Sequence, residues 1–232
     1  MVPTLLLIDI DGTLMHSGDA GKRAMVKASN AIFGPSFVWD GVNVAGHLDP
    51  LIFAEAAALN GLADPDTQHV RFRRRYIQLL AEELELRKHL VELTPGMNDL
   101  ISQLRRRAQT VGDVILGMLT GNYTEAVPLK LASVGVDPAW FTVTAFGDDA
   151  PTRPDLTRLA MVKYEKLRGH QPDPHRVIVI GDTPRDVACA HAHGCVAFAV
   201  ATGHYSASQL QDSGADHVVE DFSDPGPLMA LL

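Results

Sequence analysis

The chain has 232 residues, of which 46% are hydrophobic and 21% are charged, and its formal net charge is −8 at pH 7. This composition is typical of a soluble globular protein, and the length allows one large domain or two small ones. The negative charge argues against a general nucleic-acid binder, which normally carries a basic face, and no stretch approaches the about 18 apolar residues of a membrane span.

The first residues and the cysteines indicate the compartment. The N-terminal apolar stretch is short, lacks a basic flank and runs directly into acidic residues, unlike a secretory signal peptide. Two cysteines do not make a disulfide framework. We therefore expect a cytoplasmic protein without membrane or nucleic-acid partners, acting as a monomer or homodimer.

Short apolar runs rich in β-branched residues alternate with helical patterns along most of the chain. This alternation predicts βαβ units and an α/β fold with a doubly wound, Rossmann-like parallel sheet. Reactive groups in such sheets collect where the carboxyl ends of the strands meet the loops. The expected strands are residues 4–8, 114–119, 141–145, 176–180, 195–200 and 217–219.

One stretch, residues 16–92, shows no convincing strand and only helical patterns around 20–33, 50–60 and 67–87. It predicts an inserted all-helical domain over 16–93, with 1–15 and 94–232 forming the α/β body. The sequence Thr94-Pro95-Gly96 marks the return to that body, before a helix over 97–107. A run of basic residues in the third helix is expected to be a solvated face: Arg71, Arg73, Arg74 and Arg75.

The first motif, Asp9-Ile10-Asp11-Gly12-Thr13-Leu14, directly follows the first expected strand. Side chains alternate along an extended backbone, so Asp9 and Asp11 can project together. Two carboxylates this close ionise together only when a cation neutralises them, unless one keeps its proton. The pattern suits phosphoryl transfer, with one carboxylate as nucleophile and metal ligand and the other as general acid/base. The alternative is a strand-ending turn with solvated acids.

The second motif, Thr120-Gly121-Asn122, follows the expected strand 114–119. A hydroxyl and free backbone N–H groups at a strand-to-helix junction can cradle phosphate oxygens. Asn122 or Thr124 also has the chemistry to cap a helix that starts there. Taken alone, these residues favour capping over phosphate binding.

The third motif, Gly181-Asp182-Thr183-Pro184-Arg185-Asp186, follows the expected strand 176–180. Mg²⁺ prefers a few carboxylate oxygens, so Asp182 is placed to complete a metal site with Asp9. Asp186, one helical turn on, can support that site through a hydrogen bond or a water. The alternative is an acidic helix N-terminus that interacts with the dipole. Because all three motifs follow strands of one predicted sheet, they can converge.

Together these motifs resemble the haloacid dehalogenase-like (HAD) hydrolases: DxDGT at 9–13, Thr120, and GDxxxD at 181–186, in that order. The inserted helices resemble the C1 helical cap, as in phosphoglycolate phosphatases, and the similarity spans the chain. The resemblance implies Mg²⁺ as cofactor and an aspartyl-phosphate intermediate. It assigns Asp9 as nucleophile, Asp11 as acid/base whose backbone carbonyl also meets the metal, and Asp182 as third metal contact. The implied phosphate-binding residues are Gly12, Thr120, Gly121 and Asn122.

The residue at position 11 narrows the reaction class that the resemblance implies. Dehalogenases of the family carry an aromatic residue there, and phosphonate-cleaving relatives a small one. A carboxylic acid fits protonation of an alkoxide leaving group and then activation of water. We expect hydrolysis of a small phosphorylated metabolite, phosphoglycolate-like or a sugar phosphate. A phosphomutase of the β-phosphoglucomutase type and a non-catalytic phosphate-binding protein are the alternatives.

Two further residues depend on the resemblance. The family usually places a lysine, often followed by proline, between the second and third motifs, and this chain has Arg153-Pro154 instead. Arginine keeps the charge but is no isostere of lysine. The resemblance implies that this cation neutralises the nucleophile and the phosphate, and we favour Arg153 over Lys163 for that role. In the cap, the loop 44–49 resembles the one that faces the substrate in C1-capped relatives. It makes His47 a candidate substrate contact, ahead of Lys22 and Arg23.

Overall fold

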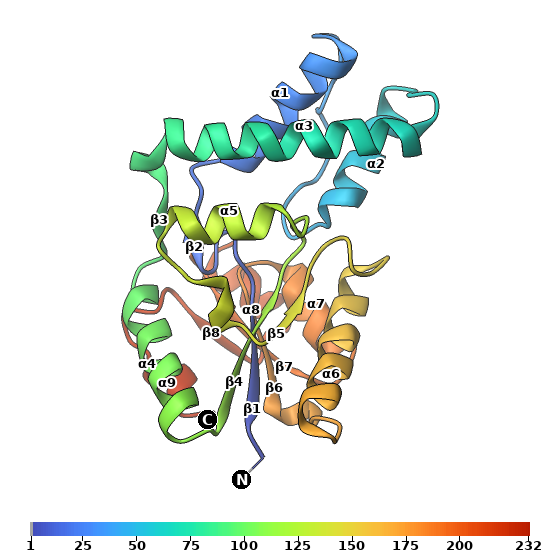
Figure 1. Cartoon of the computed structure of the whole chain (residues 1–232). Coiled ribbons are helices and arrows are strands. Elements are labelled where there is room, and N and C mark those ends of the chain that lie inside the picture. The colour runs from blue at the N-terminus through green and yellow to red at the C-terminus, as the bar shows by residue number, and fades with distance from the viewer. Residues whose placement is uncertain (1) are drawn as a thin grey trace.

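The computed structural model describes residues 2–232 and contains a six-stranded parallel sheet (Figure 1). Chain order runs outward in both directions from β1, which lies between β4 and β6, so the sheet is doubly wound. The predicted α/β fold class is confirmed. In spatial order the strands are β5 (Val143–Ala145), β4 (Val114–Leu119), β1 (Thr4–Ile8), β6 (Val177–Gly181), β7 (Val196–Val200) and β8 (His217–Val219).

Helices cover both faces of this sheet, which explains why its strands are continuous apolar runs. Along β1, Leu6 and Ile8 pack into one buried cluster and Leu5 and Leu7 into the other. The first cluster includes residues of α4 (Met97–Thr110), α5 (Ala126–Ser133) and α9 (Gly226–Met229). The second includes residues of α6 (Arg153–Arg168), α7 (Pro184–His191) and α8 (Ala207–Asp212).

Three inserted helices, which we call the cap together with their connecting loops, lie across the carboxyl ends of the strands (Figure 1). They are α1 (Ala20–Phe33), α2 (Asp49–Leu59) and α3 (Pro65–Leu86). The cap has its own apolar cluster, in which the Phe53 and Phe72 rings stack with centroids 4.5 Å apart. This position makes the cap one wall of any site at the strand ends. The domain boundaries at 15/16 and 93/94 stay a prediction.

The chain leaves and re-enters the body through a short ribbon, where β2 (Met15–His16) pairs antiparallel with β3 (Glu92–Leu93). The expectation of no strand in 16–92 is therefore wrong at both edges, because two-residue strands are too short to show periodicity. The expected strand 141–145 begins only at Val143, since a 3₁₀ turn closes when Phe141 N–H donates to the Pro138 carbonyl. The 3₁₀ helices are Lys88–Leu90, Pro138–Trp140 and Pro174–Arg176. Within residues 2–232, no helix has the length and apolar character that crossing a bilayer requires.

Candidate active site

The loops that follow β1, β4 and β6 meet beneath the cap and enclose a cavity of about 420 Å³. Parallel strands present their carboxyl ends at one edge, so motifs far apart in the sequence converge there. The nucleophile, acid/base, metal and phosphate-binding candidates, with His47, all line this cavity: Asp9, Asp11, Gly12, His47, Thr120, Gly121, Asn122, Arg153 and Asp182.

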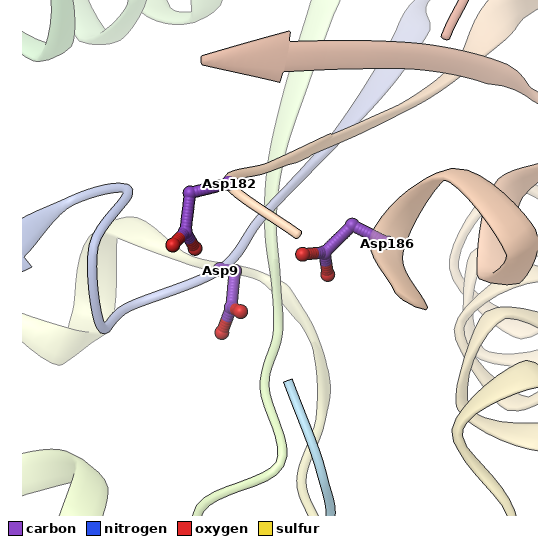
Figure 2. A group of neighbouring side chains, drawn as sticks. All are labelled: Asp9, Asp182 and Asp186. Carbon is purple, nitrogen blue, oxygen red and sulfur yellow. The ribbon is translucent and has the colours of Figure 1, made fainter. Parts of the chain in front are cut away.

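Three buried carboxylates gather at the strand ends. Oxygens of Asp9, Asp182 and Asp186 all lie within 4.8 Å of one another, and Figure 2 shows the three side chains pointing toward a common space. Burial raises the pKa of Asp9 to about 6, although the charge of Arg153 opposes the shift. Burial also raises the pKa of Asp182 to about 8, with repulsion from Asp186 and Asp9 adding to it. The cluster therefore holds more negative charge than its surroundings stabilise.

Arg153, at the first position of α6, supplies the cation that touches this cluster. Its Nη2 donates to Asp9 Oδ2 at 2.7 Å and also to Asp186 Oδ1, and its side chain is 6% exposed. Its Nη1 donates to the Gly46 carbonyl of the cap at 3.0 Å. Lys163, the alternative from the sequence, lies outside the cavity, because its ammonium donates to the Thr144 carbonyl at 2.6 Å.

The sequence offered two alternatives for Asp186, a hydrogen bond that supports the site and an acidic residue at a helix N-terminus. Its contacts include both kinds of interaction. As residue N3 of α7 it forms a capping box with Thr183, whose hydroxyl donates to Asp186 Oδ2 at 2.7 Å. Its other oxygen accepts from Arg153, so both oxygens are engaged. Asp186 therefore fixes the helix terminus and the guanidinium together.

The donor set at Asp9 and Asp182 fits a divalent cation. Of the three buried carboxylates, Asp9 and Asp186 pair with the Arg153 guanidinium and Asp182 does not. Carboxylate oxygens are the ligands that hard cations such as Mg²⁺ prefer. Asp182 is held in place: its Oδ1 accepts from the Thr13 hydroxyl at 3.2 Å. A Cβ at Gly12 or Gly203 would lie 2.4 or 1.7 Å from Asp182 Oδ2, so only glycine leaves room for that carboxylate.

The Asp11 side chain turns away from the three-carboxylate cluster toward a lysine. It is 42% exposed, forms an ion pair with Lys130 of α5, and accepts from the Ser17 hydroxyl at 3.4 Å. The ammonium of Lys130 also donates to Asn122 Oδ1 at 2.8 Å. Sequence reasoning missed Lys130, whose one signal was a lysine among the apolar residues of a short helix.

The helix-capping interpretation of the second motif is wrong. Helix α5 begins only at Ala126, and no side chain caps it. The Asn122 side chain is taken by Lys130, and the Thr124 hydroxyl donates to Asp148 Oδ1 at 2.9 Å. Thr120 is buried at the end of β4 and lines the cavity. The loop therefore extends along the cavity wall before the helix starts.

The loop that follows β4 also forms hydrogen bonds with the cap. The backbone N–H of Asp49 donates to the Gly121 carbonyl at 2.7 Å, and the Tyr123 N–H donates back to Asp49 Oδ2 at 2.9 Å. A Cβ at Gly121 would lie 2.0 Å from the His47 carbonyl oxygen, so the close approach requires glycine. Burial raises the pKa of Asp49 to about 7. The first turn of α2 is thus locked onto the second motif.

The cap residues expected near the substrate divide into two groups. His47 and Lys22 line the cavity, and burial lowers the pKa of His47, with the charge of Arg185 adding to the shift. Arg23 lies outside it, because its guanidinium pairs with buried Glu83 at 2.6 Å. The nearby basic run is also not uniformly solvated: Arg73 pairs with Glu125 and Asp148 of the body.

Comparison with known proteins agrees with this geometry. Residues 154–225 match the family described as HAD-hydrolase-like. The phosphoglycolate phosphatase of Synechococcus elongatus is 26% identical over 219 residues, covering 94% of this chain and 93% of that protein. The phosphoglycolate phosphatase of Mannheimia succiniciproducens is 25% identical over 227 residues, covering 95% of each.

A solved structure repeats the fold along the whole chain. CbbY from Rhodobacter sphaeroides, solved in complex with phosphate, has a TM-score of 0.72 and 22% identity, covering 97% of both chains. At this identity the likeness establishes the fold alone. The chain is therefore a distant relative, over nearly its full length, of HAD-like phosphatases of the phosphoglycolate phosphatase kind.

Proposed function

We propose that the chain hydrolyses a small-molecule phosphate monoester with Mg²⁺ as cofactor, through a phosphoryl intermediate on Asp9. The observation that carries the proposal is the setting of Asp9, a buried carboxylate on the cavity wall that contacts Arg153 and lies beside Asp182. Asp11, two residues on, lines the same cavity with a more exposed carboxylate. One cavity thus offers a nucleophile, a cation and a second carboxylate for proton transfer.

In the first step, an Asp9 carboxylate oxygen attacks phosphorus, and the bond from phosphorus to the leaving oxygen breaks. Asp11 gives its proton to that oxygen, so an alcohol leaves instead of an alkoxide. The nucleophile must be ionised, and the Arg153 guanidinium on Asp9 Oδ2 favours that form. Thr120 and the backbone N–H groups of Gly121 and Asn122, which line the cavity, would hold the phosphoryl oxygens.

In the second step, Asp11 takes a proton from water as the water oxygen attacks phosphorus. The bond between phosphorus and Asp9 breaks, and inorganic phosphate leaves. The cap over the strand ends limits the entry of other water and strengthens the charge interactions inside. A phosphomutase would differ only here, with a hydroxyl group of a sugar phosphate in the place of water.

The carboxylates of Asp9 and Asp182 and the backbone carbonyl of Asp11 would hold Mg²⁺. When bound, the ion neutralises charge on the transferring phosphoryl group and helps to orient it. Asp9 and Asp182, with their raised pKa values, are the groups whose ionised forms gain most from a cation. Asp186 would support Asp9 through Arg153, which contacts both carboxylates.

The relatives and the size of the cavity support a proposal for the substrate class. The similar enzymes are phosphoglycolate phosphatases, and CbbY has been solved with phosphate and with xylulose-1,5-bisphosphate. A cavity of about 420 Å³ is in the range of small-ligand sites. We therefore place the substrate among phosphorylated small acids and sugar phosphates.

The test is phosphate release from a panel of such esters, with and without Mg²⁺, for wild type, Asp9→Asn and Asp11→Asn. We expect Mg²⁺-dependent release that Asp9→Asn abolishes. Asp11→Asn should lower turnover by about 10²–10⁴-fold, the usual contribution of general acid–base catalysis. It should still bind Mg²⁺, because its backbone carbonyl remains.

The alternatives give different results in the same assay. Full Mg²⁺-dependent turnover by Asp9→Asn would show that Asp9 is not the nucleophile. Substrate isomerisation without phosphate release would identify a mutase. Tight binding of several esters without any conversion would identify a binding protein that kept the fold.

A further inference from the structure

Lys130 is a buried cation in the cavity that the proposed steps do not use. Its side chain is 3% exposed, and its ammonium contacts the Asp11 carboxylate and Asn122 Oδ1. Lysines usually extend their ammonium groups into water, and a buried one needs acceptors around it. Here these two acceptors belong to the first and second motifs. The side chain therefore links the acid/base candidate to the phosphate-binding loop.

We propose that Lys130 is a positioning residue that holds the Asp11 carboxylate where the leaving group departs. The inference rests on the proposed function, in which Asp11 transfers the proton. Within residues 2–232, the Asp11 carboxylate has one hydrogen-bond donor besides Lys130, the Ser17 hydroxyl at 3.4 Å. Proton transfer requires the carboxyl group to stay within hydrogen-bond reach of the leaving oxygen, and a loosely held, 42% exposed side chain does not meet that requirement alone.

The base of Lys130 is rigid, which a positioning residue needs. Its neighbours on α5, Val127 and Leu131, are buried in the apolar cluster on one face of the sheet. Ala126 packs into the apolar cluster of the cap. Helix α5 is therefore held from both sides, and it presents the lysine from a fixed backbone.

Lys130 also lies on the cap side of the cavity, where a leaving group would extend from the phosphoryl site. A Cβ placed on Gly21 of cap helix α1 would be 3.9 Å from Lys130 Nζ and 3.5 Å from the Tyr76 hydroxyl. Arg153, in contrast, contacts Asp9 and Asp186. The two cations thus serve different carboxylates, with Arg153 at the nucleophile and Lys130 at the acid/base.

The first test compares leaving groups in single-turnover experiments on Lys130→Met. The release of p-nitrophenolate needs little protonation, whereas an alcohol from an alkyl phosphate needs a proton. If Lys130 acts through Asp11, cleavage of the alkyl ester should fall about tenfold or more, within the range of general acid catalysis. The release of p-nitrophenolate should change by less than about twofold, because that step does not depend on the acid.

The second test is a double-mutant cycle with Asp11→Asn. Once Asp11 cannot transfer a proton, adding Lys130→Met should lower alkyl-ester cleavage little further, because interacting residues are non-additive. Lys130→Arg should restore part of the activity, since it keeps the charge. Lys130→Gln keeps hydrogen bonding without charge and serves if the methionine variant does not fold. Lys163→Met is the matched control, a charge removal outside the cavity, and should have no effect.

Three results would overturn the inference. Equal loss for both substrates together with a lower melting temperature would make Lys130 structural. A raised KM with effects that add to those of Asp11→Asn would make it a direct substrate contact. Normal kinetics in every Lys130 variant would remove it from the reaction, while the Asp9→Asn and Asp11→Asn results would still stand. Full activity in Asp9→Asn would instead reject the underlying function.

Discussion

Arg153 illustrates at the level of one residue why arginine and lysine are not equivalent at this site. One guanidinium group contacts Asp9, Asp186 and the Gly46 carbonyl of the cap. A guanidinium offers its donors in a fixed planar fork, whereas an ammonium is a compact point charge. Arg153 therefore joins the nucleophile candidate, the terminus of α7 and the cap loop in one set of hydrogen bonds.

We predict that Arg153→Lys and Arg153→Met separate these contributions. Arg153→Lys keeps the charge but reaches fewer of the three acceptors, so kcat should fall about tenfold, less than the roughly 10²–10³-fold typical of losing an oxyanion donor. Arg153→Met leaves two buried carboxylates without a cation and should cost about 3–5 kcal/mol of unfolding free energy. Phosphate release and thermal denaturation measure the two effects. Wild-type turnover in Arg153→Lys would show that the fork is not needed.

At the level of elements, Arg73 of cap helix α3 joins the cap to the body through ion pairs. Arg73 pairs with Glu125 and with Asp148, and its guanidinium lies 4.8 Å from the centre of the Tyr123 ring. Tyr123 directly follows the second motif, Thr120-Gly121-Asn122, and donates its N–H to Asp49 of α2. Two cap helices therefore meet the body at the same loop, so the position of the cap and the shape of that loop are linked.

We predict that Arg73→Gln weakens cap closure without unfolding the chain. Partly exposed ion pairs contribute about 0.5–1 kcal/mol, so KM should rise about two- to fivefold with little change in melting temperature. The same rise should appear in wild type at high salt, which screens the pairs. Arg74→Gln is the matched control, because Arg74 is the exposed neighbour on the same helix. Equal KM values for both variants would show that the Arg73 contacts do not hold the cap.

At the level of the whole molecule, several buried carboxylates of this acidic chain lie around one cavity. The pKa values of Asp49 and Asp182 are raised to about 7 and about 8. In this pH range the folded protein holds protons that the unfolded chain has already lost. The free energy of unfolding therefore decreases as the pH rises through 7 and 8. Mg²⁺ would bind the deprotonated carboxylates, so its stabilising effect should increase over the same range.

We predict that the melting temperature in a chelator falls between about pH 7 and pH 8.5, and that the gain from saturating Mg²⁺ grows over that range. Each kcal/mol corresponds to about 2–4 °C for a chain of this size. Asp182→Asn should flatten the fall near pH 8 and remove most of the Mg²⁺ gain, because one carboxylate of the pair is gone. Thermal denaturation across this range tests both statements. A melting temperature that stays constant over this pH range in the chelator would contradict the raised pKa values of Asp49 and Asp182.

Much of the fold could be predicted from the sequence because it depends on local patterns. The bounds of β1, β4, β8 and α1 agree with the expected ranges, since each is a bounded apolar or periodic segment. The convergence of the three motifs also followed from the sequence, because the carboxyl ends of parallel strands share one edge. Polar residues placed directly after a predicted strand were therefore enough to locate the site.

Contacts between distant side chains were decided only by the tertiary structure. Arg153 and Asp9 are 144 residues apart, and Lys130 and Asp11 are 119 apart. Neither pairing leaves a periodic signal, because each depends on how a helix packs against the sheet. The same holds for the Asn122 side chain, which binds Lys130 instead of capping a helix. The sequence by itself determined the elements and the sheet edge where the three motifs meet. Helix packing decided which cation contacts which carboxylate.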